Sequence, residues 1–149
     1  MSEQLLLSND ITQVPLLAAW INSLGRELQL SDSCIFQLNL ALEEAVVNVM
    51  NYAYPGEEGR PVLLSAEHLI TDDTKERVVF TLIDEGIPFD PTQEATPDIT
   101  LPAENRQIGG LGIFLVENLM EKVVYQRKEE RNVLVMTYLI ERTVKVINT

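Results

Sequence analysis

The sequence is poor in cysteine and has no long apolar run. Its 149 residues include one cysteine, Cys34, so no internal disulfide can form, which fits a reducing compartment. No apolar run approaches the roughly 18 residues that a membrane span needs, and the start, Met1-Ser-Glu-Gln, lacks the basic residues of a signal peptide. We therefore expect a cytoplasmic protein that does not enter a membrane.

Basic residues and histidine are also scarce. The chain has 11 Lys and Arg against 23 Asp and Glu, and its formal net charge is −12. Such a chain repels phosphate backbones, which argues against a nucleic-acid partner, although backbone N–H groups or a metal ion can still hold a single compact anion. His68 is the only histidine, and we interpret it as a partly exposed strand residue rather than a metal ligand or phospho-acceptor.

The remaining composition is that of an ordinary globular protein, with 46% apolar and 23% charged residues, and the length fits a single domain spanning 1–149. Apolar residues at helical spacing predict three helices, and shorter apolar runs predict five strands. The predicted helices are 12–28, a second from the cap at 31–33 to about 52, and a third from the glycines at 109–112 to about 120, and the predicted strands are 4–7, 62–70, 77–84, 123–127 and 133–140. Strands in hairpin-like pairs with helices between them indicate an α+β sandwich, one mixed but mostly antiparallel sheet covered on one face by helices.

Residues 39–51 predict a helix with one polar stripe. Glu44, Asn48 and Asn51 are spaced by four and three residues, which places them on one side of the helix, one turn apart. Glu43 points about 100° away from Glu44. Polar groups that become buried need partners, and a ligand or a metal ion can be the partner. An ordinary solvated face is the alternative, and this stripe alone does not decide between them.

Two turns that contain glycine carry the other candidate groups. Asp84 ends an apolar strand and Gly86 follows, which places a carboxylate at a sheet edge where it can accept a hydrogen bond from an exocyclic amine such as that of adenine. A common structural turn is the alternative. Further along, Gly109-Gly110-Leu111-Gly112 opens a helix, where backbone N–H groups can converge on an anion, or where the glycines can serve as a hinge.

Taken in order, the three segments resemble a known family. The segments E-E-A-V-V-N-V-M-N, D-E-G-I-P-F-D-P and G-G-L-G-I-F-L-V are similar to the three ATP-binding boxes of the Bergerat-fold ATPases, which include histidine kinases, DNA gyrase, Hsp90 and MutL. Within that superfamily the chain looks most like the small bacterial anti-sigma-factor serine/threonine kinases. The resemblance covers nearly the whole chain and implies the Bergerat fold with bound ATP and Mg²⁺.

The resemblance also implies a role for each motif. Glu44 is implied as the general base, Asn48 as the ligand of Mg²⁺, and Asp84 as the hydrogen-bond acceptor for the adenine amine. The other nucleotide-binding positions that it implies are Asn51, Gly86, Arg106, Gly109, Gly110, Leu111 and Gly112. Residues 91–108, which contain three prolines and little periodicity, are implied as a lid over ATP.

The implied function is phosphorylation of a STAS-domain antagonist, combined with sequestration of a sigma factor. A homodimer is also implied, and the flank of the first helix around Trp20 is a candidate interface. One departure favours an alternative: Ile108 stands where such kinases often carry an arginine, and Arg106 lies two residues further back. The alternative is a regulatory binding module that responds to nucleotide without phosphotransfer. A third hypothesis, ATP hydrolysis coupled to dimer closure, is weaker because the chain lacks a transducer domain.

Overall fold

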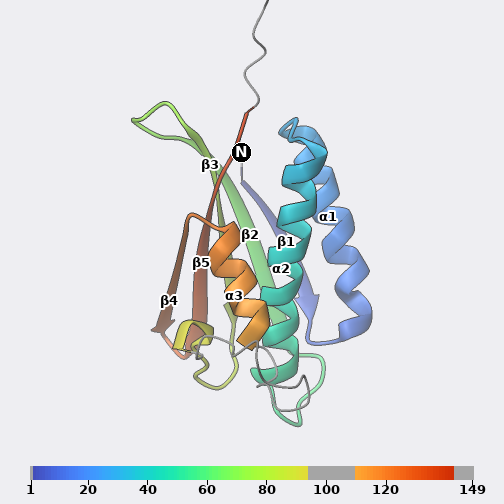
Figure 1. The fold of residues 1–149 in the computed structure, drawn as a ribbon. Helices are drawn as coiled ribbons and strands as arrows, with labels where there is room; N and C mark the ends of the chain where they lie inside the picture. Colours follow the sequence, from blue (N-terminus) through green and yellow to red (C-terminus); the bar gives the residue numbers. More distant parts are fainter. Residues whose placement is uncertain (1, 94–109, 143–149) are drawn as a thin grey trace, which may run out of the picture.

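The computed structural model describes residues 2–93 and 110–142, which form a sheet layer and a helix layer (Figure 1). The elements in chain order are β1 (Ser2–Ser8), η1 (Ile11–Gln13), α1 (Val14–Glu27), α2 (Asp32–Tyr52), β2 (Pro61–Ile70), β3 (Glu76–Asp84), η2 (Pro91–Gln93), α3 (Gly110–Leu119), β4 (Lys122–Lys128) and β5 (Arg131–Leu139). The strands form one sheet in the order β1-β2-β3-β5-β4. The predicted α+β sandwich with helices on one face is confirmed, but every pairing of these described strands is antiparallel, so the expected mixed sheet contains no parallel pair among them.

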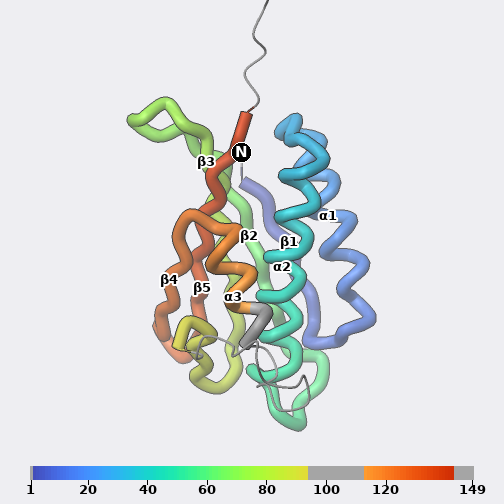
Figure 2. Tube along the Cα trace, in the orientation of Figure 1, coloured from blue at the N-terminus to red at the C-terminus, as the bar shows by residue number. Residues whose placement is uncertain are grey.

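The core lies between the sheet and the three helices, which follow one another across one face of the sheet (Figure 2). Alternate residues of the central strands point into this core, and Phe80 of β3 is completely buried. Trp20 of α1 packs edge-on against Phe80, with 6.5 Å between the ring centroids. Trp20 therefore contributes to the core but remains partly exposed, and Leu16, one turn earlier on α1, is an exposed large apolar residue, so the dimer interface expected on this flank stays a prediction.

The helix that carries the polar stripe starts at a side-chain cap. Ser31 Oγ accepts a hydrogen bond from the Cys34 backbone N–H at 3.1 Å, which satisfies one of the free donors at the start of α2. Gly25 of α1 lies against Ile35, and a Cβ at this glycine would lie 2.5 Å from the Ile35 side chain. This close approach of α1 and α2 explains a glycine near the end of α1 that would otherwise only weaken it. None of the described helices is long and apolar enough to cross a membrane.

The turn between β4 and β5 is shorter than the sequence suggested. Only Glu129 and Glu130 separate the two strands, with φ angles of 53° and 64°. Two consecutive residues in the left-handed region are typical of the tightest hairpin turns, which usually contain Gly, Asn or Asp. The predicted turn 128–132 was therefore too long, and Asn132 belongs to β5, where it pairs with Asp84 of β3.

Candidate nucleotide-binding site

Asp84 stands at the end of β3 with its side chain buried, 3% of the residue being exposed. Its Oδ1 accepts a hydrogen bond from the Gly86 backbone N–H at 2.9 Å and another from Asn132 Nδ2 at 2.8 Å. Among the described residues both hydrogen bonds to this carboxylate end on Oδ1, which leaves Oδ2 for a ligand. The carboxylate is thus held in one orientation with one acceptor oxygen available, as recognition of an amine requires.

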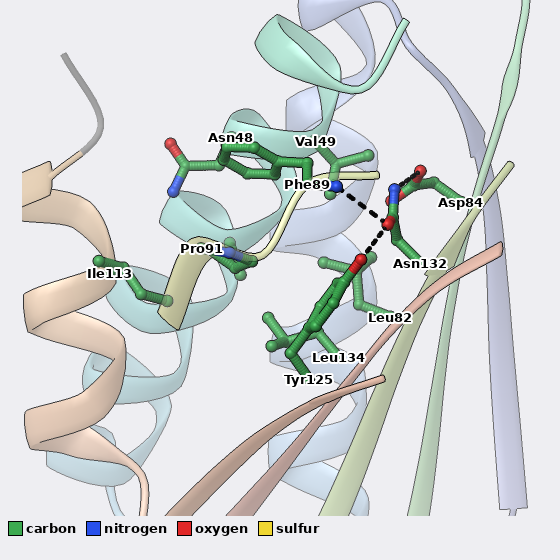
Figure 3. Close-up of a pocket in the computed structure, with 11 residues that line it drawn as sticks. Asn48, Val49, Leu82, Asp84, Phe89, Pro91, Ile113, Tyr125, Asn132 and Leu134 are labelled. Carbon is green, nitrogen blue, oxygen red and sulfur yellow. Dashed lines mark hydrogen bonds between the residues drawn. The ribbon is translucent and has the colours of Figure 1, made fainter. Parts of the chain in front are cut away.

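Asn132 is a site residue that the sequence reasoning missed. Besides its bond to Asp84, Asn132 Nδ2 donates to the Ile87 carbonyl oxygen at 2.7 Å. Its Oδ1 accepts from the Tyr125 hydroxyl at 2.6 Å and from the Phe89 backbone N–H at 3.2 Å (Figure 3). Since both ends of the amide have partners, Asn132 joins strands β3, β4 and β5 to the loop that follows Asp84.

The loop after Asp84 is also attached to the end of α2. The Ile87 backbone N–H donates to the Ala53 carbonyl oxygen at 2.9 Å, and the Glu85 backbone N–H donates to the Tyr54 hydroxyl at 2.6 Å. A Cβ at Gly86 would collide with the backbone oxygen of Ala53. Gly86, which the resemblance implies as a nucleotide-binding position, is therefore required in this structure by the close approach of the loop to the end of α2.

A small cavity lies between Asp84 and α2, with a volume of about 20 Å³. It is lined by Ala45, Asn48, Val49, Leu82, Asp84, Phe89, Pro91, Ile113, Tyr125, Asn132 and Leu134. A volume of this size holds about one water molecule. A purine ring needs more room than this cavity offers, and Phe89 and Pro91 line it from the segment that leads into the short helix η2.

The polar stripe of α2 divides into residues at different depths. Asn48 is buried and lines the cavity; its amide points toward α3, away from Asp84, as Figure 3 shows. Glu44, one turn earlier, is partly exposed, and Glu43 is exposed. Asn51 is also exposed and does not line the cavity. The structure thus brings Asn48 and Asp84 to the same cavity, whereas Glu44, one helical turn before Asn48, is not among the residues that line it.

The glycine-rich motif is described only in part. Residues Arg106 and Gly109, and the predicted lid from 94 onward, lie outside the described residues. The predicted helix begins at Gly110, so Gly110, Leu111 and Gly112 form the first turn of α3. This helix packs against α2, which places its start in the layer that carries Asn48 (Figure 1).

The electrostatics of Asp84 follow from its burial. Burial raises the pKa of the Asp84 carboxyl above its ordinary value, and the hydrogen bonds from Asn132 and Gly86 and the charge of Arg127 partly oppose this rise. The Arg127 guanidinium also donates to the Gly86 carbonyl oxygen at 2.8 Å, which fixes it beside the loop. A ligand amine that donates to the ionised carboxylate would further favour the charged form.

A metal cluster built from protein side chains is not found in the described part of the chain. No group of three or more His, Cys, Asp or Glu side chains there could hold a metal ion. Mg²⁺, however, commonly keeps several water ligands and binds through one or two protein oxygens together with phosphate oxygens. The buried amide of Asn48 at the cavity wall fits that kind of shared site.

The fold and the pocket together define a class of protein. An antiparallel sheet with a helix layer on one face places a buried aspartate at a strand end opposite an asparagine on a helix, as in the ATP-binding domains that the three motifs resemble. The family model described as "Histidine kinase-like ATPase domain" matches residues 7–138. The chain therefore belongs to the histidine kinase-like ATPase family.

The similar proteins narrow this assignment. The chain is 30% identical over 118 residues to "Serine/threonine-protein kinase BtrW" of Bordetella bronchiseptica, which covers 79% of this chain and 80% of that protein. It is 35% identical over 119 residues to "Serine-protein kinase RsbW" of Listeria monocytogenes, which covers 77% of this chain and 73% of that protein. These relatives confirm the resemblance to the small serine/threonine kinases of this family.

A solved structure supports the fold independently. The crystal structure of the RsbU and RsbW domains of Rv1364c from Mycobacterium tuberculosis matches with a TM-score of 0.67 at 15% identity. The match covers 99% of this chain and 35% of the solved chain. At this level of identity the likeness concerns the fold alone.

Proposed function

We propose that the protein is a Mg·ATP-dependent serine/threonine protein kinase that acts as a regulatory switch. The observation that carries the proposal is that buried Asp84 and buried Asn48, from opposite layers of the fold, line the same cavity. The names of the similar kinases support the same conclusion. Asp84 Oδ2 accepts a hydrogen bond from the adenine amine, and Asn48 is the protein ligand of Mg²⁺.

The phosphate end of the nucleotide lies at the start of α3. Gly110, Leu111 and Gly112 offer backbone N–H groups in the first turn of this helix, where the helix dipole favours an anion. Gly109, Arg106 and the lid precede them in the sequence, and Asn51, which is exposed at the end of α2, stays in the proposal only through the resemblance. Because the chain carries a net charge of −12, Mg²⁺ and these backbone dipoles supply most of the positive potential.

Phosphotransfer needs a base beside the nucleotide, and Glu44 is the candidate. It lies one helical turn from Asn48 and is partly exposed, so a protein substrate can reach it. The acceptor hydroxyl oxygen attacks the γ-phosphorus, the bond to the bridging oxygen of ADP breaks, and Glu44 takes the hydroxyl proton. Positioning and charge neutralisation are the main requirements of such a transfer.

The substrate in this proposal is a small STAS-domain protein, and the output is control of a sigma factor. The purified chain and the STAS protein encoded nearest its gene are incubated with labelled Mg·ATP. Labelling of a serine or threonine by the wild type, and its loss in Glu44→Gln with ATP binding retained, is the expected result. Sedimentation of the full chain tests the homodimer that the resemblance implies.

A nucleotide-dependent binding module is the second candidate function. Ile108, at the position where similar kinases often carry an arginine, favours it. In that case ATP changes the affinity for the partner, Asp84→Asn abolishes the change, and no phosphoprotein forms. The same labelling experiment, combined with a binding titration of the partner, separates the two functions.

A further inference from the structure

One ridge of α2 leads from the solvent into the candidate site. Phe36, Leu40, Glu44 and Asn48 occupy every fourth position, so each side chain lies next to the following one. Their exposure falls along the ridge: Phe36 is 63% exposed, Leu40 37%, Glu44 partly exposed and Asn48 6%. Two exposed apolar side chains therefore lead directly to the candidate base.

The two outer side chains contribute little to the core. The opposite side of α2, including Leu38 and Leu42, is completely buried against the sheet. Single exposed apolar residues are normal on protein surfaces. An exposed phenylalanine and leucine in adjacent turns, in register with a functional stripe, form a surface that a partner can cover.

We propose that Phe36 and Leu40, here called the outer ridge, dock the protein substrate of the kinase. This inference rests on the proposed function. A rise of 1.5 Å per residue places Leu40 about 6 Å and Phe36 about 12 Å along the helix from Glu44. A folded substrate that presents its acceptor hydroxyl to Glu44 therefore also covers the outer ridge.

The charges around the ridge indicate the chemistry of the partner surface. Residues 32–52 contain Asp32, Glu43 and Glu44 and no Lys or Arg. Glu43 is exposed beside the ridge. The complementary surface is an apolar patch bordered by Lys or Arg and adjacent to the acceptor serine or threonine.

The test compares the double variant Phe36→Ser/Leu40→Ser with the matched control Ile70→Ser in the full chain. Ile70 is 72% exposed and pairs with Glu76, at the end of the β2–β3 hairpin opposite to Asp84. All these positions are on the surface, where substitutions are usually tolerated. Initial rates are measured with the STAS protein encoded nearest the gene, and calorimetry measures Mg·ATP affinity for each variant.

The double variant is expected to raise KM for the protein substrate about tenfold or more, since tenfold corresponds to about 1.4 kcal/mol and hot-spot truncations cost about 2 kcal/mol or more. The kcat and Mg·ATP affinity of the double variant remain those of the wild type. The single variant Phe36→Leu, which keeps an apolar side chain, raises KM less than the double variant does, and Ile70→Ser leaves KM unchanged. An unchanged KM in the double variant, with an active wild type, overturns the docking inference alone.

Two further outcomes separate the docking inference from a failure of the proposed function and from dimer formation. If the wild type phosphorylates no serine or threonine of this substrate and does not bind it, the proposed function fails, whatever the variant does. If sedimentation shows a wild-type dimer and a monomeric double variant, a second copy of the chain covers the ridge, and the substrate-docking inference is overturned.

Discussion

The replacement of Asn132 by leucine tests the account of the Asp84 pocket most severely. Leucine has nearly the same shape, but it removes the donor to Asp84 and Ile87 and the acceptor for Tyr125 and the Phe89 N–H. Each buried polar group left without a partner costs about 1–3 kcal/mol. With one or two of these groups kept from water, we expect the free energy of unfolding to fall by about 2–4 kcal/mol.

Urea denaturation of the full chain measures this loss, and calorimetry measures Mg·ATP binding under conditions where the variant is folded. Because the Asp84 carboxylate loses the Asn132 donor that orients it, we expect ATP affinity to weaken by about tenfold, the equivalent of one hydrogen bond. The control is Gln126→Ala on the neighbouring strand β4, which changes an exposed side chain. It should shift the free energy of unfolding by no more than about 0.5 kcal/mol.

A second substitution at the same position adds a pH signature. Asn132→Asp places two carboxyl groups in contact, so the pair retains a proton to a higher pH than either group does in the unfolded chain. Because the folded pKa is then raised, stability is greatest at low pH and is lost as pH rises through the raised pKa. If Asn132→Leu unfolds at the same urea concentration as the wild type, and Asn132→Asp shows no added pH dependence, the reasoning about this network is refuted.

Three other substitutions test the surrounding structure. Gly86→Ala should destabilise the fold by about 1–3 kcal/mol, since a methyl group collides with the backbone of Ala53, and thermal unfolding checks this. Phe80→Ala should cost about 3–5 kcal/mol in urea denaturation, because Phe80 is fully buried. The pKa of Glu76 is lowered to about 2, mainly by hydrogen bonds from Arg142. The stability from this lowered pKa is present at neutral pH and is lost as pH falls from about 5 toward 2, so Glu76→Gln should flatten that part of the stability profile; an unchanged profile would contradict the assignment.

Much of the fold could be predicted from the sequence because the apolar residues recur with a regular spacing. In α2 the buried residues recur every three or four positions, and Ser31 gives a clear start, so the helix was predicted within a residue at each end. The strand that ends at Asp84 was equally clear, and a carboxylate at the end of an apolar strand indicated a binding position there without knowledge of its hydrogen-bond partners. Local periodicity and caps carry this information because they act within one element.

The part of the prediction that was wrong, the place of Asn132, depends on contacts between segments that are distant in the sequence. Asn132 was assigned to the charged turn 128–132, whereas the turn consists of Glu129 and Glu130, which are not residues that usually occupy a two-residue hairpin turn. Once the turn is that short, the pairing of β3 with β5 places Asn132 opposite Asp84. No local pattern reports this register, so a residue 48 positions away from its partner was missed.

Calorimetric titration of the full chain with Mg·ATP tests the central claim most directly, with Asp84→Asn as the comparison. We expect the wild type to bind the nucleotide and Asp84→Asn to lose that binding while remaining folded, because an amide in place of the carboxylate offers the adenine amine a weaker and differently oriented acceptor. No binding by the wild type at millimolar nucleotide, or equal binding by both proteins, would contradict the account.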